Sequence, residues 1–343
     1  MGVDLGELVE REDIEFADLN DKEIAIDAMN TLYQFLSIIR QRDGTPLKDS
    51  DGNITSHLSG VFYRNIKVLE NNIRPVYVFD GEMPDLKQKE SSRRRKKREE
   101  ARKEWKKLKE EGKIDEAFSK ATQSSKIDGE MLEEAKKLLE AMGLPYVQAP
   151  SEGEAQAAYM TREESKGDIY AVGSQDWDCL LFGAERMVKN LTTRKTRKKA
   201  SGGRKQISTE RIELGEVLEQ LDISREKLVW MGVLMGTDFN PDGVKGIGPK
   251  TALKLVKKYQ KFDSLMEDEK VEWESDNDPY RIRDFFLDPP VEDSGYKFSE
   301  PENDRIKEIL IDKHDFSEKR VNSGIQNLEK ALEARQSGLG SFV

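Results

Sequence analysis

The sequence predicts an α/β protein with a mostly parallel central sheet flanked by helices. Short apolar runs alternate with stretches of helical periodicity, and this strand–helix–strand order is typical of a parallel sheet. Acidic residues also stand in small, separated groups where an apolar strand or helix ends. With 343 residues, the chain can bury one large core or two coupled ones.

The first elements alternate clearly. Apolar residues of the second expected helix recur every three or four positions, which places them on one face. In order, we expect a strand over 23–27, a helix over 31–40, a turn-rich loop over 44–53, a helix over 57–71 and a strand over 74–79.

The segment from Asp85 to about Ser125 departs from this alternation. From Lys87 to Lys113 there are 14 Lys/Arg and 6 Glu, a net charge of +8. This composition favours helix but leaves little apolar stripe to face a core. We expect a helical excursion from the core that is partly mobile without a ligand.

The rest of the chain returns to alternating elements and then becomes helical. Gly143 is expected to cap the helix before it. The expected elements are a helix over 131–142, a strand over 145–147, a helix over 153–163, a strand over 168–173, a short element over 180–182, a basic flexible loop over 192–205, helices over 208–221 and 224–235, an irregular segment over 276–301, and helices over 303–311 and 317–335.

Composition excludes several classes of protein. The single cysteine, Cys179, forbids an intrachain disulfide, and its apolar flanks favour a buried small hydrophobe over a nucleophile. His57 and His314 are the only histidines, so a His-rich metal site is not expected, and we interpret both as structural. No apolar run is long enough to span a bilayer and no signal-peptide pattern is present, so we expect a soluble, intracellular protein.

The net charge of −10 hides two basic runs. Besides the run at 87–113, residues 189–205 contain 8 Lys/Arg and no acid. Local basic patches make phosphate contacts regardless of the overall charge. A charge run alone is often a solvated helix face, but two runs beside a carboxylate cluster favour nucleic acid.

Seven carboxylates are the candidate metal ligands. Side chains at the carboxyl ends of parallel strands meet in one crevice, and carboxylates gathered there need a cationic partner. Mg²⁺ and Mn²⁺ prefer oxygen ligands, so the pattern predicts a metal-dependent enzyme acting on phosphate esters. The seven are Asp27, Asp80, Glu152, Glu154, Asp176, Asp178 and Asp238.

Each of these carboxylates also has a structural interpretation. Asp27 and Asp80 could be turn or N-cap aspartates. Ser151 to Glu154 fits a capping box, which would account for Glu154 but not for Glu152. Asp176 and Asp178 could be two solvated acids in a turn.

The segment 243–256 has the pattern of a helix-hairpin-helix. Its Gly246-x-Gly248 turn places backbone N–H groups at a helix N-terminus, which suits a phosphate. Lys245, Lys250 and Lys254 add positive charge. An ordinary Gly-capped helical hairpin is the alternative. A phosphate-binding hairpin would grip the nucleic-acid backbone without selecting sequence.

Five blocks of sequence, in order, resemble those of the flap endonucleases, the structure-specific 5′ nucleases of the XPG superfamily. The resemblance covers essentially the whole chain, and its length is similar to that of archaeal members. The blocks are Ile-Asp-Ala-Met-Asn-Thr-Leu-Tyr, Arg-Pro-Val-Tyr-Val-Phe-Asp-Gly, Ala-Pro-Ser-Glu-Gly-Glu-Ala, Gly-Ser-Gln-Asp-Trp-Asp-Cys, and Gly-Thr-Asp-Phe followed by Gly-Val-Lys-Gly-Ile-Gly-Pro-Lys.

This resemblance implies a 5′ nuclease (PIN-like) fold and two Mg²⁺ ions, for which Mn²⁺ could substitute. Asp80, Glu152 and Glu154 would serve mainly one ion, with Asp27 acting largely through water. Asp176, Asp178 and Asp238 would serve mainly the other. Lys87 and Arg94 would steer the scissile phosphate, and Tyr33 would stack on the nucleotide beside it.

The resemblance also implies how DNA and partners are held. The excursion would be a helical arch for the 5′ single strand, and the hairpin would hold the duplex with a possible monovalent cation. The tail would bind the sliding clamp (PCNA) through Gln336, Leu339, Phe342 and Val343, although the family usually has a second aromatic residue where Val343 stands. We expect the free tail to be disordered.

The implied activity is cleavage of branched DNA with a 5′ flap, with 5′–3′ exonuclease activity, in replication (Okazaki fragment processing) and repair. A sister exonuclease or junction resolvase and a non-catalytic clamp-bound scaffold are the alternatives. We expect a monomer in the cytoplasm or nucleoid. The expected regions are 1–98 and 126–258 (nuclease), 85–125 (arch), 259–335 (C-terminal helices) and 336–343 (clamp-binding tail).

Overall fold

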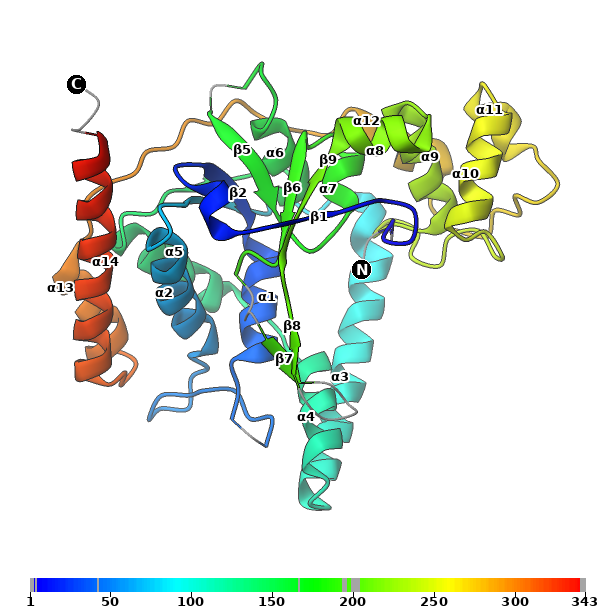
Figure 1. Ribbon diagram of the computed structural model, residues 1–343. Helices are drawn as coiled ribbons and strands as arrows, with labels where there is room; N and C mark the ends of the chain where they lie inside the picture. The colour runs from blue at the N-terminus through cyan, green and yellow to red at the C-terminus, as the bar shows by residue number, and fades with distance from the viewer. Residues whose placement is uncertain are drawn as a thin grey trace.

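A seven-stranded mixed sheet forms the centre of the computed structural model (Figure 1), which describes residues 3, 5–41, 43–165, 167–192, 196–198 and 204–339. Strands β2 to β6 run parallel to one another, and β9 is antiparallel to both β6 and β1. The predicted fold class is therefore confirmed. In spatial order the strands are β1 (Glu12–Ile14), β9 (Thr209–Glu213), β6 (Arg186–Lys189), β5 (Ile169–Gly173), β2 (Glu23–Asp27), β3 (Arg74–Phe79) and β4 (Tyr146–Gln148).

Helices cover both faces of the sheet because the central strands are apolar on both sides. In β3, Tyr77 and Phe79 belong to one buried cluster while Val76 and Val78 belong to the other, as the two-residue period of a strand requires. The first face carries α1 (Ala28–Ile38), α2 (Ser56–Leu69), α5 (Gly129–Ala141), α13 (Asn303–Lys307), a π turn (Glu308–Asp312) and α14 (Glu318–Leu339). The second carries α6 (Gly153–Met160), α7 (Asp178–Leu181), α8 (Leu214–Leu221), α9 (Arg225–Met235), α10 (Pro249–Lys258), α11 (Phe262–Met266) and α12 (Pro279–Leu287).

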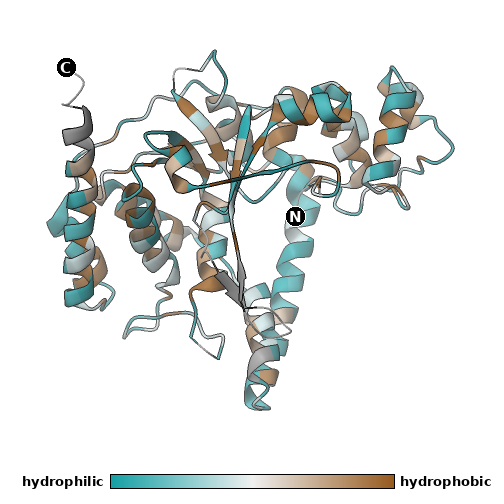
Figure 2. Cartoon of the chain, in the orientation of Figure 1, coloured by the Kyte–Doolittle hydropathy of each residue, from teal (hydrophilic) through white to brown (hydrophobic). Residues whose placement is uncertain are grey.

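The charged excursion is helical, as expected. After the short turn η2 (Asp85–Lys87), α3 (Gln88–Glu110) and α4 (Ile114–Gln123) pack against each other and project beyond the sheet (Figure 1). Figure 2 shows α3 as mostly hydrophilic. The excursion also touches the loop after α1, because Lys109 Nζ lies 2.8 Å from Asp43 Oδ2 and Arg40 donates to Ser125 Oγ at 2.7 Å.

The two histidines lie in one buried cluster around Glu134 on α5. His314 Nδ1 is 2.9 Å from Asp49 Oδ2, and its Nε2 is 3.0 Å from Glu134 Oε1. His57 Nε2 lies 3.7 Å from Glu134 Oε2. The cluster joins the loop before α2 to the C-terminal helices, which agrees with a structural interpretation of both histidines.

Several expectations for the second half of the chain are wrong. The helix expected over 208–221 is β9 followed by α8; β9 was hidden because charged residues surround Ile212, which pairs with Met187 of the unpredicted β6. The loop expected over 192–205 contains two short strands, β7 (Thr196–Lys198) and β8 (Arg204–Gln206), which pair with each other. Strand β1 was also not predicted, and the segment expected to be irregular over 276–301 contains α12.

The first part of the C-terminal tail, residues 336–339, differs from the expectation of disorder. Helix α14 continues through Leu339, since helix-favouring residues such as Ala331, Leu332 and Glu333 precede the tail and carry the helix onward. The side chains of Gln336 and Leu339, and residues 340–343 with Phe342 and Val343, lie outside the described part of the structure. Within that part, no helix is both long and apolar enough to cross a membrane.

Candidate active site

Six of the seven predicted carboxylates line one cavity of about 670 Å³ at the carboxyl edge of the parallel strands. Four parallel strands end at this edge and bring most of the acids to it. Asp27 is the last residue of β2, Asp80 directly follows β3, Glu152 and Glu154 follow β4, and Asp176 follows β5. Tyr33, Lys87 and Arg94 line the same cavity. The lining carboxylates are Asp27, Asp80, Glu152, Glu154, Asp176 and Asp238, and Asp178 lies buried behind them.

Asp27 and Asp80 are held by backbone N–H groups. Asp27 caps α1 by accepting from Asn30 N at 3.0 Å, and Asp80 Oδ1 accepts from Gly153 N at 2.8 Å. A Cβ at position 153 would lie 2.8 Å from that same oxygen, so only glycine permits this approach. The N-cap interpretation of Asp27 is therefore correct, yet its side chain also lines the cavity.

The capping-box interpretation of Glu154 is wrong. The N-cap of α6 is Glu152, and no side chain caps this helix. Ser151 instead donates to the carbonyl of Glu82 at 3.1 Å, and Glu154 accepts from Ser174 Oγ at 3.3 Å. Both glutamates are thus directed to the site at the start of α6.

The second group of acids follows β5 and α9. Asp176 N donates to Ser174 Oγ at 3.1 Å, which shapes the turn after β5. Asp178 is 2% exposed and its Oδ1 accepts from Val3 N at 2.8 Å, so the N-terminal segment closes the back of the site. Asp238 belongs to the loop after α9.

Burial, together with the crowded negative charge, raises the pKa of most of the buried acids. Burial, with the charge of Asp80, raises the pKa of Asp27 to about 7. Burial and Asp176 raise the pKa of Glu154 and of Asp178 well above their ordinary values. Burial also raises the pKa of Glu152, although Lys87 opposes the shift. The cavity therefore favours cations.

Lys87 and Arg94 supply positive charge that offsets part of the negative charge of these acids. Lys87 Nζ lies 2.6 Å from Glu152 Oε2 and 3.4 Å from Asp238 Oδ2. Arg94 donates to Asp238 through Nη2 and, at 2.9 Å, to Glu90 through Nε. Burial by itself would raise the pKa of Asp238. The positive charges of Lys87 and Arg94 outweigh burial and lower this pKa below its ordinary value.

The donor set fits hard divalent cations, which take carboxylate oxygens. Within the described residues, however, no three acidic, histidine or cysteine side chains already surround one point. Glu152 and Asp238 face Lys87 instead. Side chains must therefore rotate, and Lys87 must release Glu152, for a metal ion to be coordinated by this set.

Sequence reasoning missed two polar residues that frame the site. Glu90 accepts from Arg94 Nε, and its Oε2 forms an ion pair with Arg93, whose Nε lies 2.7 Å away. Asn277 donates to the carbonyls of Leu86 and Phe239. Glu90 could have been found from its four-residue spacing to Arg94 on an expected helix, whereas no local pattern singles out Asn277.

The segment predicted to be a helix-hairpin-helix consists of the turn at 243–248 and α10, which packs against α9. Gly248 is the N-cap of α10, and Gly246 has a φ of +79°, where L side chains are strained. A Cβ on either glycine would meet no atom within 4 Å, so the turn faces open space. Lys245, Lys250 and Lys254 are exposed beside it.

The second basic run is only partly described. Lys189, its first residue, lies on β6 with Nζ 4.4 Å from the centre of the Trp177 ring. Burial and nearby Arg11 lower the pKa of Lys189. Cys179 is fully buried, and burial raises the pKa of its thiol, which agrees with a small hydrophobe rather than a nucleophile.

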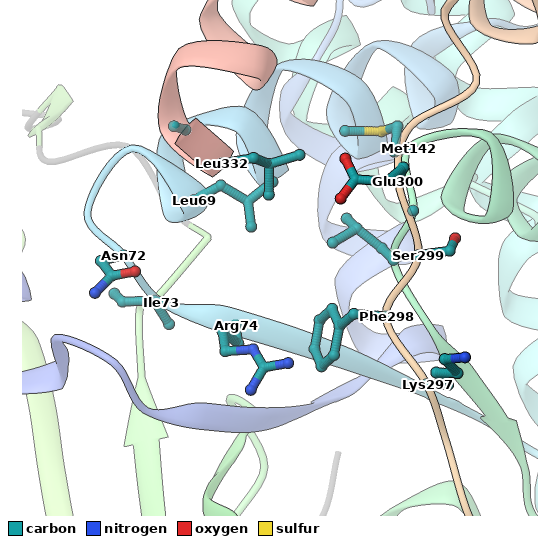
Figure 3. A pocket seen from close by; sticks show the side chains of 13 residues that line it. Leu69, Asn72, Ile73, Arg74, Met142, Lys297, Phe298, Ser299, Glu300 and Leu332 are labelled. Carbon is teal, nitrogen blue, oxygen red and sulfur yellow. The ribbon is translucent and has the colours of Figure 1, made fainter. Parts of the chain in front are cut away.

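A second cavity, of about 540 Å³, lies where β3 begins, away from the acidic cavity. Figure 3 shows its lining of Leu69, Ile73, Met142, Phe298 and Leu332. The guanidinium of Arg74 lies 4.0 Å from the centre of the Phe298 ring at its edge. This lining is largely apolar and offers none of the chemistry of the acidic cavity.

Comparison with known families identifies the class. A model described as the XPG N-terminal domain matches residues 4–101, and one described as the XPG I-region matches residues 143–238. These segments carry all seven carboxylates as well as Lys87 and Arg94. The fold and the acidic cavity thus belong to the XPG class of proteins.

Full-length relatives narrow the class further. Flap endonuclease 1 of Pyrococcus abyssi is 53% identical over 100% of this chain and 98% of the relative. The solved flap endonuclease-1 from Methanococcus jannaschii is 42% identical, with a TM-score of 0.75 over 97% of this chain and 100% of that one. The catalytic core of Rad2 in complex with DNA substrate (23% identical, TM-score 0.65, covering 93% of this chain and 96% of that one) shares the fold. The chain belongs to the flap endonuclease 1 family and is a metal-dependent nuclease that hydrolyses phosphodiester bonds of DNA.

Proposed function

We propose that this nuclease cleaves 5′ flaps in branched DNA, with 5′–3′ exonuclease activity, at the cavity between the sheet edge and α3. One observation carries the proposal: six of the seven candidate metal ligands share the lining of a single cavity with Lys87, Arg94 and Tyr33, at the base of a basic helical excursion. Family membership supports phosphodiester hydrolysis as the reaction, and the acidic cavity is the site at which we place it.

The seven carboxylates would hold two Mg²⁺ ions, for which Mn²⁺ can substitute. Asp80, Glu152 and Glu154 would serve one ion, with Asp27 acting through water. Asp176, Asp178 and Asp238 would serve the other. A pair of divalent cations activates the attacking water and stabilises the leaving oxygen. The raised pKa values of Glu154 and Asp178 support this assignment, because cations would relieve the repulsion.

Lys87 and Arg94 would bind the scissile phosphate through their N–H groups. Both sit at the base of α3 and line the cavity, and both are held by carboxylates in the protein without DNA. Their exchange of a carboxylate for a phosphate oxygen would place positive charge where negative charge develops. Tyr33 would stack on the adjacent nucleotide.

The helix-hairpin-helix and the excursion would position the DNA. The open turn at Gly246 and Gly248, with Lys245, Lys250 and Lys254 beside it, suits a duplex phosphate and a bridging monovalent cation. Helices α3 and α4 would form the arch for the 5′ strand. The tail at 336–343 would bind the sliding clamp, and one copy of the chain would act alone in the cell interior.

Replacing Asp176 with Asn tests the metal assignment. We expect cleavage of a double-flap substrate to fall by more than about a thousandfold, or about 4 kcal/mol of transition-state stabilisation. Binding of the same DNA should persist, because the duplex is held elsewhere. Asp304→Asn, at an exposed site on α13, is the matched control. Near-normal turnover of Asp176→Asn in Mg²⁺ would refute the assignment.

Mapping the products on flap, nicked and four-way substrates tests the substrate class. Preferential cleavage at the flap base is expected. A preference for four-way junctions or for nicked duplex would instead assign the chain to a sister activity.

A further inference from the structure

Asn277 lies between α11 and α12, outside every motif, yet its side chain touches the frame of the active site twice. Its Nδ2 donates to the carbonyl of Leu86 at 2.7 Å and to that of Phe239 at 2.6 Å. Leu86 directly precedes Lys87, and Phe239 directly follows Asp238. A primary amide has two N–H donors, so both are used to join the base of the arch to the Asp238 loop.

Asn277 is itself held firmly. Trp273 Nε1 donates to the backbone carbonyl of Asn277 at 2.9 Å, and the backbone N–H of Asn277 donates to Ser275 Oγ at 3.3 Å. The next residue, Asp278, caps α12. The ring of Phe239 packs edge-on against that of Phe285 on α12, with centroids 5.0 Å apart. The Asn277 side chain therefore joins the base of the arch and the Asp238 loop to the well-held segment that leads into α12.

We propose that Asn277 is a positioning residue for phosphodiester hydrolysis, acting through Lys87. The inference rests on the role given to Lys87 under the proposed function. Lys87 reaches Glu152 at 2.6 Å and Asp238 at 3.4 Å only while η2 and the Asp238 loop keep their separation. Leu86 and Phe239 are 5% and 3% exposed, so without the amide their carbonyls would have to move to find other donors.

The experiment measures single-turnover cleavage of a double-flap substrate by full-length Asn277→Ala, with Asn277→Asp as a second variant that keeps the shape but has no N–H donor. We expect each to slow cleavage by about tenfold to a hundredfold, since small displacements of a catalytic group have effects of this size. The dissociation constant for flap DNA should change by less than about threefold, as most phosphate contacts lie elsewhere. Glu272→Gln, at an exposed position of the same segment, is the control and should cleave normally.

A double-mutant cycle with Lys87→Ala separates positioning from general destabilisation. In the Lys87→Ala background, Asn277→Ala should cost less than about a further threefold, because coupled residues are not additive. An equal loss in both backgrounds, or normal cleavage by both Asn277 variants, would overturn the inference. Normal cleavage by Lys87→Ala alone would instead refute the proposed role of Lys87. Thermal melting of each variant confirms that it is folded at the assay temperature.

Discussion

Lys87 is a largely buried cation that faces two of the candidate metal ligands, Glu152 and Asp238. Burial by itself would lower its pKa, but Glu152, Asp238 and Asp80 together raise the pKa above its ordinary value. The side chain therefore stays charged at neutral pH. Arg94 behaves similarly, because Asp238 outweighs the effect of burial on its pKa.

Replacing Lys87 and Arg94 together with Ala should slow the chemical step far more than it weakens DNA binding. Loss of charge stabilisation at a developing oxyanion costs about a hundredfold to a thousandfold for one donor, whereas many phosphate contacts remain. Single-turnover rates and dissociation constants separate the two effects. Arg95→Ala with Lys96→Ala, on the same helix, is the control. A normal rate with a collapsed affinity would make the pair general DNA contacts.

Glu134 gives a prediction about stability, remote from the site. Burial would raise its pKa, but His57, Lys313 and His314 lower it to about 2, below the ordinary value of 4.5. A depressed pKa contributes stability that is complete above about pH 4.5 and is lost as the pH falls toward 2. Glu134→Gln should thus cost roughly 1.5–3 kcal/mol near neutral pH, and the deficit should shrink on acidification.

Urea unfolding from pH 7 down to the acid limit of reversibility measures this effect. Glu133→Gln is the matched control on the same helix, since the Glu133 side chain is 62% exposed and exposed pairs contribute little. A pH-independent difference between wild type and Glu134→Gln would contradict the linkage.

At the scale of single residues, the sequence allowed the candidate metal ligands to be predicted, because most of them come directly after buried elements. The seven acids could be singled out because most of them stand where an apolar run or helix ends, and such ends converge in a parallel sheet. The partners of Asn277 lie 38 and 191 positions away. An amide bonded to main-chain carbonyls leaves no pattern of residue types, so single-sequence reasoning could not have found it.

Among the elements, the helix-hairpin-helix carries the clearest expectation. Changing Lys245, Lys250 and Lys254 to Ala should weaken duplex binding uniformly over sequences. Each lost phosphate contact reduces the slope of log K against log[salt] by about 0.9, so the slope should fall by about two to three units. Titrations at several salt concentrations provide the measurement. Lys307→Ala on α13 should leave the slope unchanged, and an unchanged slope in the triple variant would remove the hairpin from the DNA interface.

Elements with strong periodicity were predictable, and those shaped by pairing were not. Helix α2 has a clear apolar face, and β3 is a continuous apolar run. In contrast, Thr209–Glu213 contains one large apolar residue, Ile212, and becomes a strand because it pairs with β6 and β1. Propensity is weak there, and the neighbouring strand decides the structure.

At the scale of the whole molecule, we expect the tail to link the nuclease to the sliding clamp. Deleting Gln336 to Val343 should leave cleavage of short flaps unchanged without clamp and should abolish the added cleavage when a cognate clamp is supplied. Helix α14 continues through Leu339, so docking as a turn would require this last part of the helix to unwind. Steady-state cleavage with and without clamp tests this, with Phe342→Ala as the point variant. Equal stimulation of full-length and shortened protein would refute clamp binding by the tail.

The overall architecture was predictable because the sequence alternates strand and helix patterns. This alternation is typical of a parallel sheet with helices on both faces. The order of the strands was not, since nothing in an apolar run states which neighbour it will take. The C-terminal attachment through His314 and Asp49, 265 positions apart, likewise depends on packing that no local signal records.

The central place of β2 has a consequence for a newly made chain. The first long strand to leave the ribosome lies between β5 and β3, and the last of the seven acids arrives with Asp238, more than two hundred positions after Asp27. Closing so long a loop comes late in folding. A nascent chain that has not yet reached Asp238 therefore lacks one of the seven acids, and we expect such a chain not to cleave DNA.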